Sequence, residues 1–178
     1  MGAWQSGNQT TVMDPAGVTR STLTDALGRI TSVTEAGTAL TSYLYDPLND
    51  LTNACQGAAF SGSTCPSGAQ PRTFAYDSLT RLTTATNPES GTTSYTYDNN
   101  GNLKTKSDPN GNVVTSSYDK LNRIISKTYT GAPTPNVTYC YDGNTQNPCT
   151  GAPTGASNSL IGHLTLVSSS ASISTYGH

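Results

Sequence analysis

A Tyr-Asp pair, or its equivalent, recurs along the chain, and its spacing restricts the fold more than any other feature. The Asp of each pair stands at positions 25, 46, 77, 98, 119 and 142, so the intervals are 21, 31, 21, 21 and 23 residues. A second turn follows 10 residues after the first in the regular repeats, as at Asp108-Pro109. Two turns per repeat predict two short strands per repeat.

The residues after each Asp have turn chemistry. An Asp that opens a four-residue turn can accept hydrogen bonds from the following backbone amides, and the residue three positions later commonly needs a left-handed conformation. Gly28, Asn49, Gly101 and Asn122 stand at that position. Thr80 occupies it in the remaining turn, which we therefore expect to be less ideal. The spacing predicts hairpin connections of three to five residues.

The composition agrees with strands and turns. The chain contains 30 Thr and 10 Tyr, whereas charged residues make up only 11% of it. A lone hairpin is marginally stable, so the repeats must stack side by side and share a ladder of Tyr and Leu side chains. The predicted fold is all-β, with repetitive antiparallel β-hairpins in an extended sheet that grows along the chain.

The charge and the motifs exclude several functions. Nine Lys and Arg balance eleven Asp and Glu, so no basic surface exists for nucleic acid, and no apolar run is long enough for membrane insertion. The repeated Asp residues favour turn capping over acid–base chemistry, and no catalytic residue, metal site or cofactor is predicted. Arg29, Arg81 and Arg123 recur at one turn position, where we expect a hydrogen bond or an ion pair with a neighbouring repeat's Asp rather than substrate binding.

The repeats suggest four segments. Residues 1–9 form a lead-in without an assigned role, and residues 10–142 hold the repeats, with a Cys-containing insertion at 53–70. Residues 143–159 form a Cys-containing loop, and 160–178 form a degenerate repeat that ends before its expected Asp, so we expect a piece of a longer chain.

Four cysteines bracket the two irregular segments. Local pairing, Cys55 with Cys65 and Cys140 with Cys149, is favoured because each pair flanks one inserted loop. Free thiols remain an alternative. A metal site is a weaker one, since no CxxC spacing occurs and His163 and His178 are isolated. Disulfides would indicate an oxidising compartment.

The motif Tyr-Asp-x-x-Gly/Asn-Arg/Asn-Leu, clearest from Tyr97-Asp98 to Leu103, resembles the YD repeat of the bacterial RHS family. The resemblance covers residues from about 10 to 142. It implies a spiralling, curved β-sheet that can close into a hollow shell. The structural repeat residues it identifies are Tyr45, Asp46, Tyr76, Asp77, Arg81, Tyr97, Asp98, Gly101, Tyr118, Asp119, Arg123, Tyr141 and Asp142.

The resemblance also implies a function. In bacterial RHS and toxin-complex proteins the shell encloses a toxic C-terminal domain. This segment is therefore expected to form part of the shell wall of a secreted or surface protein. Its expected partners are neighbouring RHS repeats and an encapsulated C-terminal domain of the same chain. The alternative is a cell-surface adhesion or carbohydrate-binding module, in which Tyr43, Tyr95 and Tyr139 would stack on a sugar or a surface protein.

Overall fold

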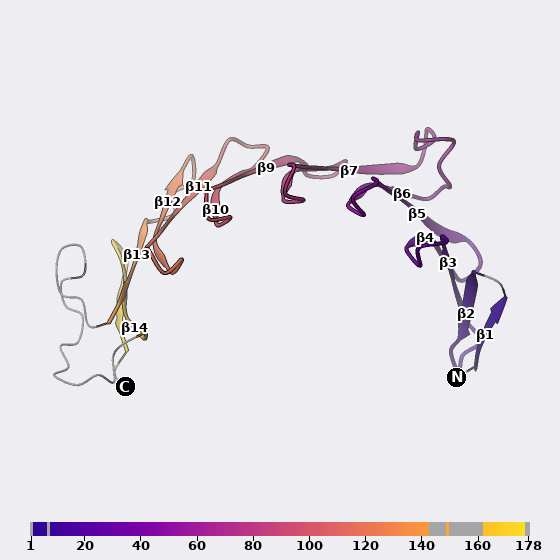
Figure 1. The fold of residues 1–178 in the computed structure, drawn as a ribbon, viewed down its shortest axis with the longest axis horizontal. Helices are drawn as coiled ribbons and strands as arrows, with labels where there is room; N and C mark the ends of the chain where they lie inside the picture. Colours follow the sequence, from indigo (N-terminus) through magenta and orange to yellow (C-terminus); the bar gives the residue numbers. More distant parts are fainter. Residues whose placement is uncertain (1, 7, 143–148, 150–161, 177–178) are drawn as a thin grey trace. The chain divides into compact units, whose positions relative to one another are not determined.

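The computed structural model describes residues 2–6, 8–142, 149 and 162–176, and these residues contain fifteen β-strands and no helix. The predicted all-β, antiparallel fold is confirmed. No helix in the described part of the chain could cross a membrane. The chain divides into two compact units, Met1–Thr92 and Thr93–His178. Each is a curved, single-layered sheet (Figure 1).

In the first unit every strand pairs with its neighbour in sequence. Register is uniform between the turns: in the fifth and sixth strands Ser42 lies opposite Cys55 and Tyr43 opposite Ala54. The strands of this unit are β1 (Gly2–Ser6), β2 (Gln9–Met13), β3 (Thr19–Thr24), β4 (Ile30–Glu35), β5 (Ala39–Tyr45), β6 (Leu51–Gln56), β7 (Gln70–Tyr76) and β8 (Leu82–Asn87).

The second unit follows the same rule, and the division between the units falls within its first strand. Its strands are β9 (Gly91–Tyr97), β10 (Leu103–Ser107), β11 (Val113–Tyr118), β12 (Ile124–Thr130), β13 (Val137–Tyr141), β14 (Leu164–Ser169) and β15 (Ile173–Thr175). The part of the segment 143–159 other than residue 149 lies outside the described residues. So do Gly177 and His178 of the predicted degenerate repeat.

The antiparallel order places successive turns at alternating edges of each sheet. We call the edge that carries the turns after the Tyr-Asp pairs the tyrosine edge: turns 25–29, 46–50 and 77–81 in the first unit, 98–102 and 119–123 in the second. Each of these hairpins contains a register shift beside its turn, as between Leu44 and Tyr45. Turns 14–18 and 36–38 close the opposite edge of the first unit, and the register of their hairpins is continuous. The recurring bulge therefore belongs to the Tyr-Asp motif.

The sheets bury few side chains completely. Strand β9 alternates between half-buried and exposed residues, with Tyr95 and Tyr97 on the half-buried face. The tyrosines and leucines of the predicted ladder stay half-buried because no second layer of structure covers either face in the described residues. The buried apolar side chains there are Val33, Ala54, Cys55, Cys140, Cys149 and Leu166.

Candidate functional site

The aspartates of the tyrosine edge each cap a turn with one carboxylate oxygen. Asp25 Oδ1 accepts hydrogen bonds from the backbone N–H groups of Leu27 at 2.9 Å and Arg29 at 3.0 Å. The same two bonds, at 2.8 to 3.0 Å, recur in four further turns, where the acceptors are Asp46, Asp77, Asp98 and Asp119. One carboxylate oxygen per turn is thus occupied by backbone amides, and the other is left for a side chain.

The position three residues after each Asp is left-handed, as expected. Its φ is 79° at Gly28, 74° at Asn49, 88° at Gly101 and 61° at Asn122. Thr80 also adopts it, with φ of 57°, and its amide donates to the Asp77 carbonyl at 3.0 Å, as Gly28 does to Asp25. The turn at Asp77 therefore keeps its hydrogen bonds, and its departure from the ideal is strain at a β-branched residue.

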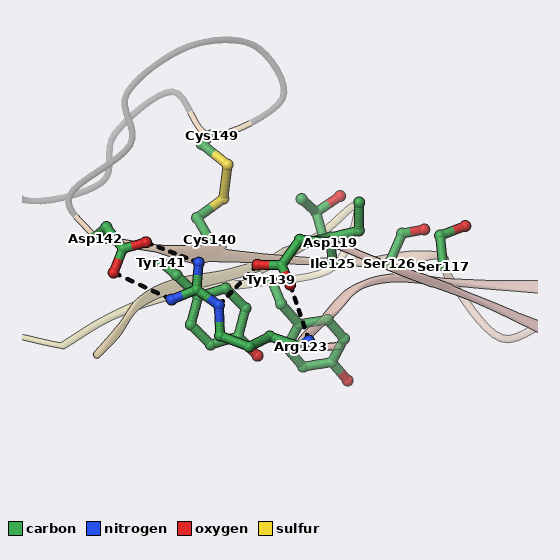
Figure 2. A pocket seen from close by; sticks show the side chains of 11 residues that line it. Ser117, Asp119, Arg123, Ile125, Ser126, Tyr139, Cys140, Tyr141, Asp142 and Cys149 are labelled. Carbon is green, nitrogen blue, oxygen red and sulfur yellow. Dashed lines mark hydrogen bonds and ion pairs between the residues drawn. A yellow bond between two sulfur atoms is a disulfide. The ribbon is translucent and has the colours of Figure 1, made fainter. Parts of the chain in front are cut away.

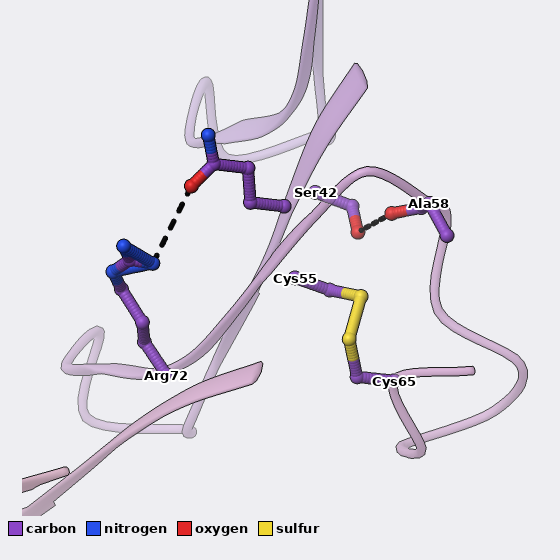
Figure 3. The surroundings of a disulfide bond; sticks show 6 residues. Ser42, Cys55, Ala58, Cys65 and Arg72 are labelled. Carbon is purple, nitrogen blue, oxygen red and sulfur yellow. Dashed lines mark hydrogen bonds between the residues drawn. A yellow bond between two sulfur atoms is a disulfide. The ribbon is translucent and has the colours of Figure 1, made fainter. Parts of the chain in front are cut away.

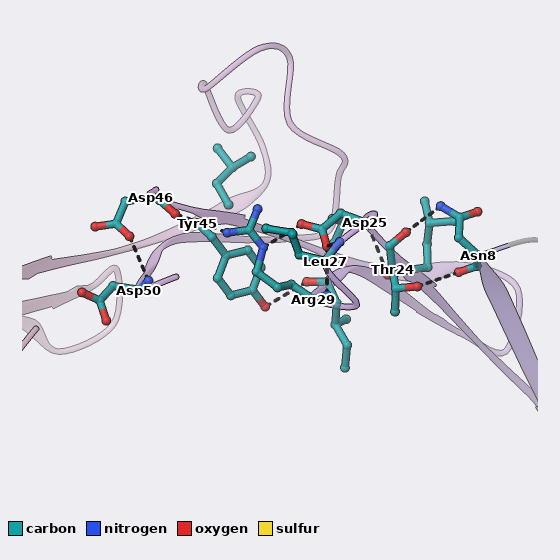
Figure 4. A network of polar contacts seen from close by, with 12 residues as sticks. Asn8, Thr24, Asp25, Leu27, Arg29, Tyr45, Asp46 and Asp50 are labelled. Carbon is teal, nitrogen blue, oxygen red and sulfur yellow. Dashed lines mark hydrogen bonds and ion pairs between the residues drawn. The ribbon is translucent and has the colours of Figure 1, made fainter. Parts of the chain in front are cut away.

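An arginine braces the first of these turns and contacts the next repeat. Arg29 Nε donates to the free oxygen of Asp25 at 2.7 Å, and Arg29 Nη1 donates to the carbonyl of Asp46 at 3.2 Å. Its guanidinium also lies over the Tyr45 ring, 4.9 Å from the centroid. Figure 4 shows this arrangement at the edge of the first sheet. One side chain thus connects its own Asp to the following Tyr-Asp pair.

The second unit repeats the brace with a stronger pair. Arg123 Nε donates to Asp119 at 2.7 Å, and both Nη atoms donate to the Asp142 carboxylate, at 3.1 and 2.7 Å. The guanidinium lies 4.4 Å from the centroid of Tyr141 (Figure 2). This bidentate, charge-assisted geometry is the strong form of an ion pair.

Asparagine replaces the arginine in the turn 98–102. Asn102 Nδ2 donates to Asp98 at 3.0 Å and to Asn122 Oδ1 at 2.9 Å, so it reaches the next tyrosine-edge turn as well. Asn100 donates to the same oxygen at 3.2 Å. In the first unit, Arg81 pairs with its own Asp77 at 2.7 Å. An uncharged amide at this position can therefore make the same kind of connection between repeats as Arg29 and Arg123.

The repeat tyrosines also connect neighbouring strands. Tyr45 donates its hydroxyl hydrogen to the carbonyl of Ile30, and Tyr118 donates to the carbonyl of Leu103, both at 2.9 Å and both 15 residues back. Burial raises the pKa of Tyr45, Tyr76 and Tyr141. These half-buried phenols therefore carry no charge at neutral pH.

The braces favour ionised aspartates. The hydrogen bond from Arg29 holds the pKa of Asp25 below its usual value of 3.8, and the bond from Arg81 does the same for the pKa of Asp77. At Asp98 the side-chain amide of Asn102 lowers the pKa. A general acid needs the opposite shift, so these carboxylates suit capping and not proton donation.

Asp50 breaks the pattern. It stands where the other turns of the tyrosine edge have Arg or Asn, and its amide donates to Asp46 in the usual way. Its Oδ2 is the one side-chain oxygen in the described residues that is buried without a hydrogen-bond partner. Burial and the neighbouring Asp46 raise the pKa of Asp50.

Two disulfides join the cysteines as predicted, Cys55 to Cys65 and Cys140 to Cys149. Cys55 lies opposite Ser42 in the sheet and is completely buried. Ser42 Oγ donates to the carbonyl of Ala58 at 2.9 Å, so a bridge and a hydrogen bond hold the base of the excursion 57–69 (Figure 3). A loop of this length contributes about 3 kcal/mol of stability in the loop-entropy account.

A pocket of about 550 Å³ lies at the second bridge, between β11, β12 and β13. Ser126, Cys140 and Cys149 line it, and the sticks of Figure 2 place the disulfide on the side of the sheet away from the Tyr139 and Tyr141 rings. No group of three or more possible metal ligands occurs in the described residues. The proposed sugar-stacking residues Tyr43, Tyr95 and Tyr139 are half-buried within their strands, and nothing in this arrangement supports a carbohydrate partner.

The structure brings the repeat residues together in one linear array along each tyrosine edge. Sequence reasoning anticipated capping by Asp and an arginine contact with the following repeat. It missed the ion pair within the turn, such as Asp25 with Arg29, although the fixed spacing of four residues was a usable signal. It also missed the leucine two residues after most of these aspartates, as at Leu27 and Leu79, whose side chains are largely exposed.

Comparisons with known proteins agree with these repeats. A family model described as RHS Repeat matches residues 76–107 and 97–134. No curated protein is significantly similar to the chain.

Solved structures share the fold at low sequence identity. The crystal structure of TcdB2-TccC3-Cdc42 is similar over 94% of this chain, with a TM-score of 0.58 and 16% identity. That of TcdB2-TccC3-TEV is similar over 93%, with a TM-score of 0.64 and 14% identity. The Photorhabdus luminescens Tc holotoxin pore aligns with a TM-score of 0.49 and 13% identity, over 91% of this chain and 9% of that chain. The present chain spans only 11% and 9% of the first two.

Proposed function

Because RHS repeats are recognised at residues 76–134 of this chain, we propose that it forms part of the wall of a β-shell that encloses a C-terminal toxin or effector of the same full-length polypeptide. The observation that carries the proposal is the RHS repeat itself, matched at residues 76–134 within hairpins that continue on both sides of the match. The fold is shared with TcdB2-TccC3 structures over more than nine-tenths of the chain.

The contacts between repeats suit a wall. A single-layered sheet has little core, so each hairpin depends on its neighbours for stability. Arg29 and Arg123 supply that dependence, because each holds its own turn and the following Tyr-Asp pair with one side chain. Adding repeats then extends the wall without a new kind of contact. No step of this function needs catalysis, since the recurring geometry of the turns uses the carboxylates as caps.

We place this wall in a secreted or cell-surface protein. Both bridges join cysteines that are only nine or ten residues apart, and Cys55, Cys140 and Cys149 are buried. Stable structural disulfides of this kind form in oxidising compartments. The expected partners are the neighbouring RHS repeats and the enclosed domain.

Protease protection tests the proposal. In the complete natural polypeptide, the C-terminal domain should resist a protease that digests the same domain expressed alone. The double variant Arg29→Ala, Arg123→Ala should make the domain more accessible, because it removes one brace in each unit. Lys104→Ala, a change at an exposed position of β10, is the matched control and should leave protection intact.

Two results would contradict the wall function. One is digestion of the C-terminal domain at equal rates in the complete polypeptide and alone. The other is a coding sequence in which no further repeats and no C-terminal domain accompany this segment.

A further inference from the structure

The tips of the tyrosine-edge turns carry an unusual apolar residue. Residues in the centre of such turns are most often Gly, Pro, Asn, Asp or Ser, yet the second residue after the Asp is leucine in four of the five turns. These side chains are 63 to 77% exposed, and they are Leu27, Leu48 and Leu79 in the first unit and Leu121 in the second. The fifth turn has Asn100 at this place.

The leucines of the first unit form a regular row. Their turns connect β3 to β4, β5 to β6 and β7 to β8, so two strands separate each leucine from the next. At the usual spacing of strands, neighbouring leucine-bearing turns are about 9 to 10 Å apart. In the turns of Leu27 and Leu79 the Asp and the Arg of the same turn neutralise each other. An exposed leucine therefore recurs along the tyrosine edge of this unit, in turns that are neutral around Leu27 and Leu79 and that carry two acids, Asp46 and Asp50, around Leu48.

The opposite edge of the first unit has a pocket between two of its turns. The pocket has a volume of about 660 Å³ and lies between the turns 14–18 and 36–38. Val12, Val18, Ala36 and Ala39 supply its apolar lining, and Val18 is half exposed. The charged residues Asp14, Arg20 and Glu35 form the rest of the lining together with Thr19. These two turns are also separated by two strands, so their spacing is the same as that of neighbouring leucines on the tyrosine edge.

We propose that the leucine row is a docking surface for the opposite edge of another strip of RHS repeats. This inference rests on the proposed wall function, because a wall wound from one long strip would bring the tyrosine edge of one layer against the opposite edge of the next. Leucine side chains enter the spaces between neighbouring turns of that edge. The contact is heterologous, with different surfaces on the two partners, so it continues from layer to layer without closing.

A second copy of the 178-residue chain is the probe for this contact. Three leucines bury little area, so the association is weak and depends on concentration. Sedimentation velocity should show reversible self-association of the wild-type chain. The triple variant Leu27→Asn, Leu48→Asn, Leu79→Asn copies the residue at position 100. Its self-association should be weaker by a factor of about ten or more. Val18→Glu should have the same effect from the opposite edge.

Mixing the two variants gives the sharpest result. Each still has one intact edge, so the mixture should form pairs and no longer assemblies. Ile173→Asn, at a similarly exposed apolar position in β15, is the control and should associate like the wild type, while circular dichroism verifies that every variant is folded.

A monomeric wild type overturns the docking proposal and leaves the wall proposal to its own test of protease protection. Unchanged association of both edge variants also overturns it and points to pairing through the free strands β1 and β15. Binding of the leucine row to the enclosed domain, and not to repeats, would be a third contrary outcome.

Discussion

Two neighbouring turns of the first unit have the same backbone and opposite chemistry. The turns 25–29 and 46–50 are both capped by the first Asp through the amides two and four residues later. The fifth residue is Arg29 in one and Asp50 in the other. Arg29 has three partners, whereas Asp50 Oδ2 is buried with none.

The difference separates two roles within the motif. The cap fixes the path of the turn, because both backbone hydrogen bonds to the first Asp are kept when the fifth residue is Asp in place of Arg. Their lengths are 2.9 and 3.0 Å in the turn 25–29 and 2.9 Å in the turn 46–50. The brace couples one repeat to the next, and a repeat sheet can tolerate the loss of one such coupling because stability is shared along the array. The motif is therefore strict at its first position and permissive at its fifth.

Removing the brace from the turn 25–29 should have the largest effect. Arg29→Ala loses the pair with Asp25, the bond to the Asp46 carbonyl and the contact with the Tyr45 ring, so we expect a loss of about 1–2 kcal/mol. Hydrogen exchange of the turn amides measures it locally. Arg29→Asn, which copies Asn102, should lose less, and equal losses for the two variants would argue against a bracing role for the polar side chain.

The strained turn 77–81 extends the comparison to the left-handed position. Thr80→Gly removes the strain of a β-branched residue at φ of 57°, at some cost in the flexibility of the unfolded chain. We expect a net gain of about 0.5–1 kcal/mol. The converse change Gly101→Thr should destabilise the turn 98–102. A gain in thermal stability for both substitutions would contradict this account.

Substitution of Asp50 should change the stability of the protein in the opposite direction to substitution of Arg29. Asp50→Asn replaces a half-buried carboxylate beside Asp46 with a neutral amide of the same shape, so it should stabilise the protein at pH 7 by less than Arg29→Ala destabilises it. Chemical denaturation at fixed pH measures the difference. Asp46→Asn is the contrasting variant, because it weakens the cap, and a destabilised Asp50→Asn protein would show that Asp50 has a partner in solution.

Much of the fold followed from the sequence because the turns are locally encoded. Asp with Gly or Asn three residues later specifies a turn through backbone hydrogen bonds alone, and the 21-residue interval sets the number of strands. Contacts between repeats were harder to predict. The pairing of Arg123 with Asp142 spans 19 residues, including the turn between β12 and β13, and the exposure of Leu27 depends on the side of the turn from which the residue projects. The isolation of Asp50 needs the three-dimensional surroundings.

The pH dependence of the two turns should differ in sign. Asp25 has a lowered pKa, so the stability it contributes is present above its usual pKa of 3.8 and is lost as the pH falls through the lower folded value. Asp50 has a raised pKa, so its protonated form is favoured in the folded state and stability is lost as the pH rises through that value. The advantage of Asp50→Asn over the wild type should therefore be greatest at neutral pH and should shrink on acidification. An advantage that is constant between neutral and acidic pH would mean that Asp50 is not the titrating group.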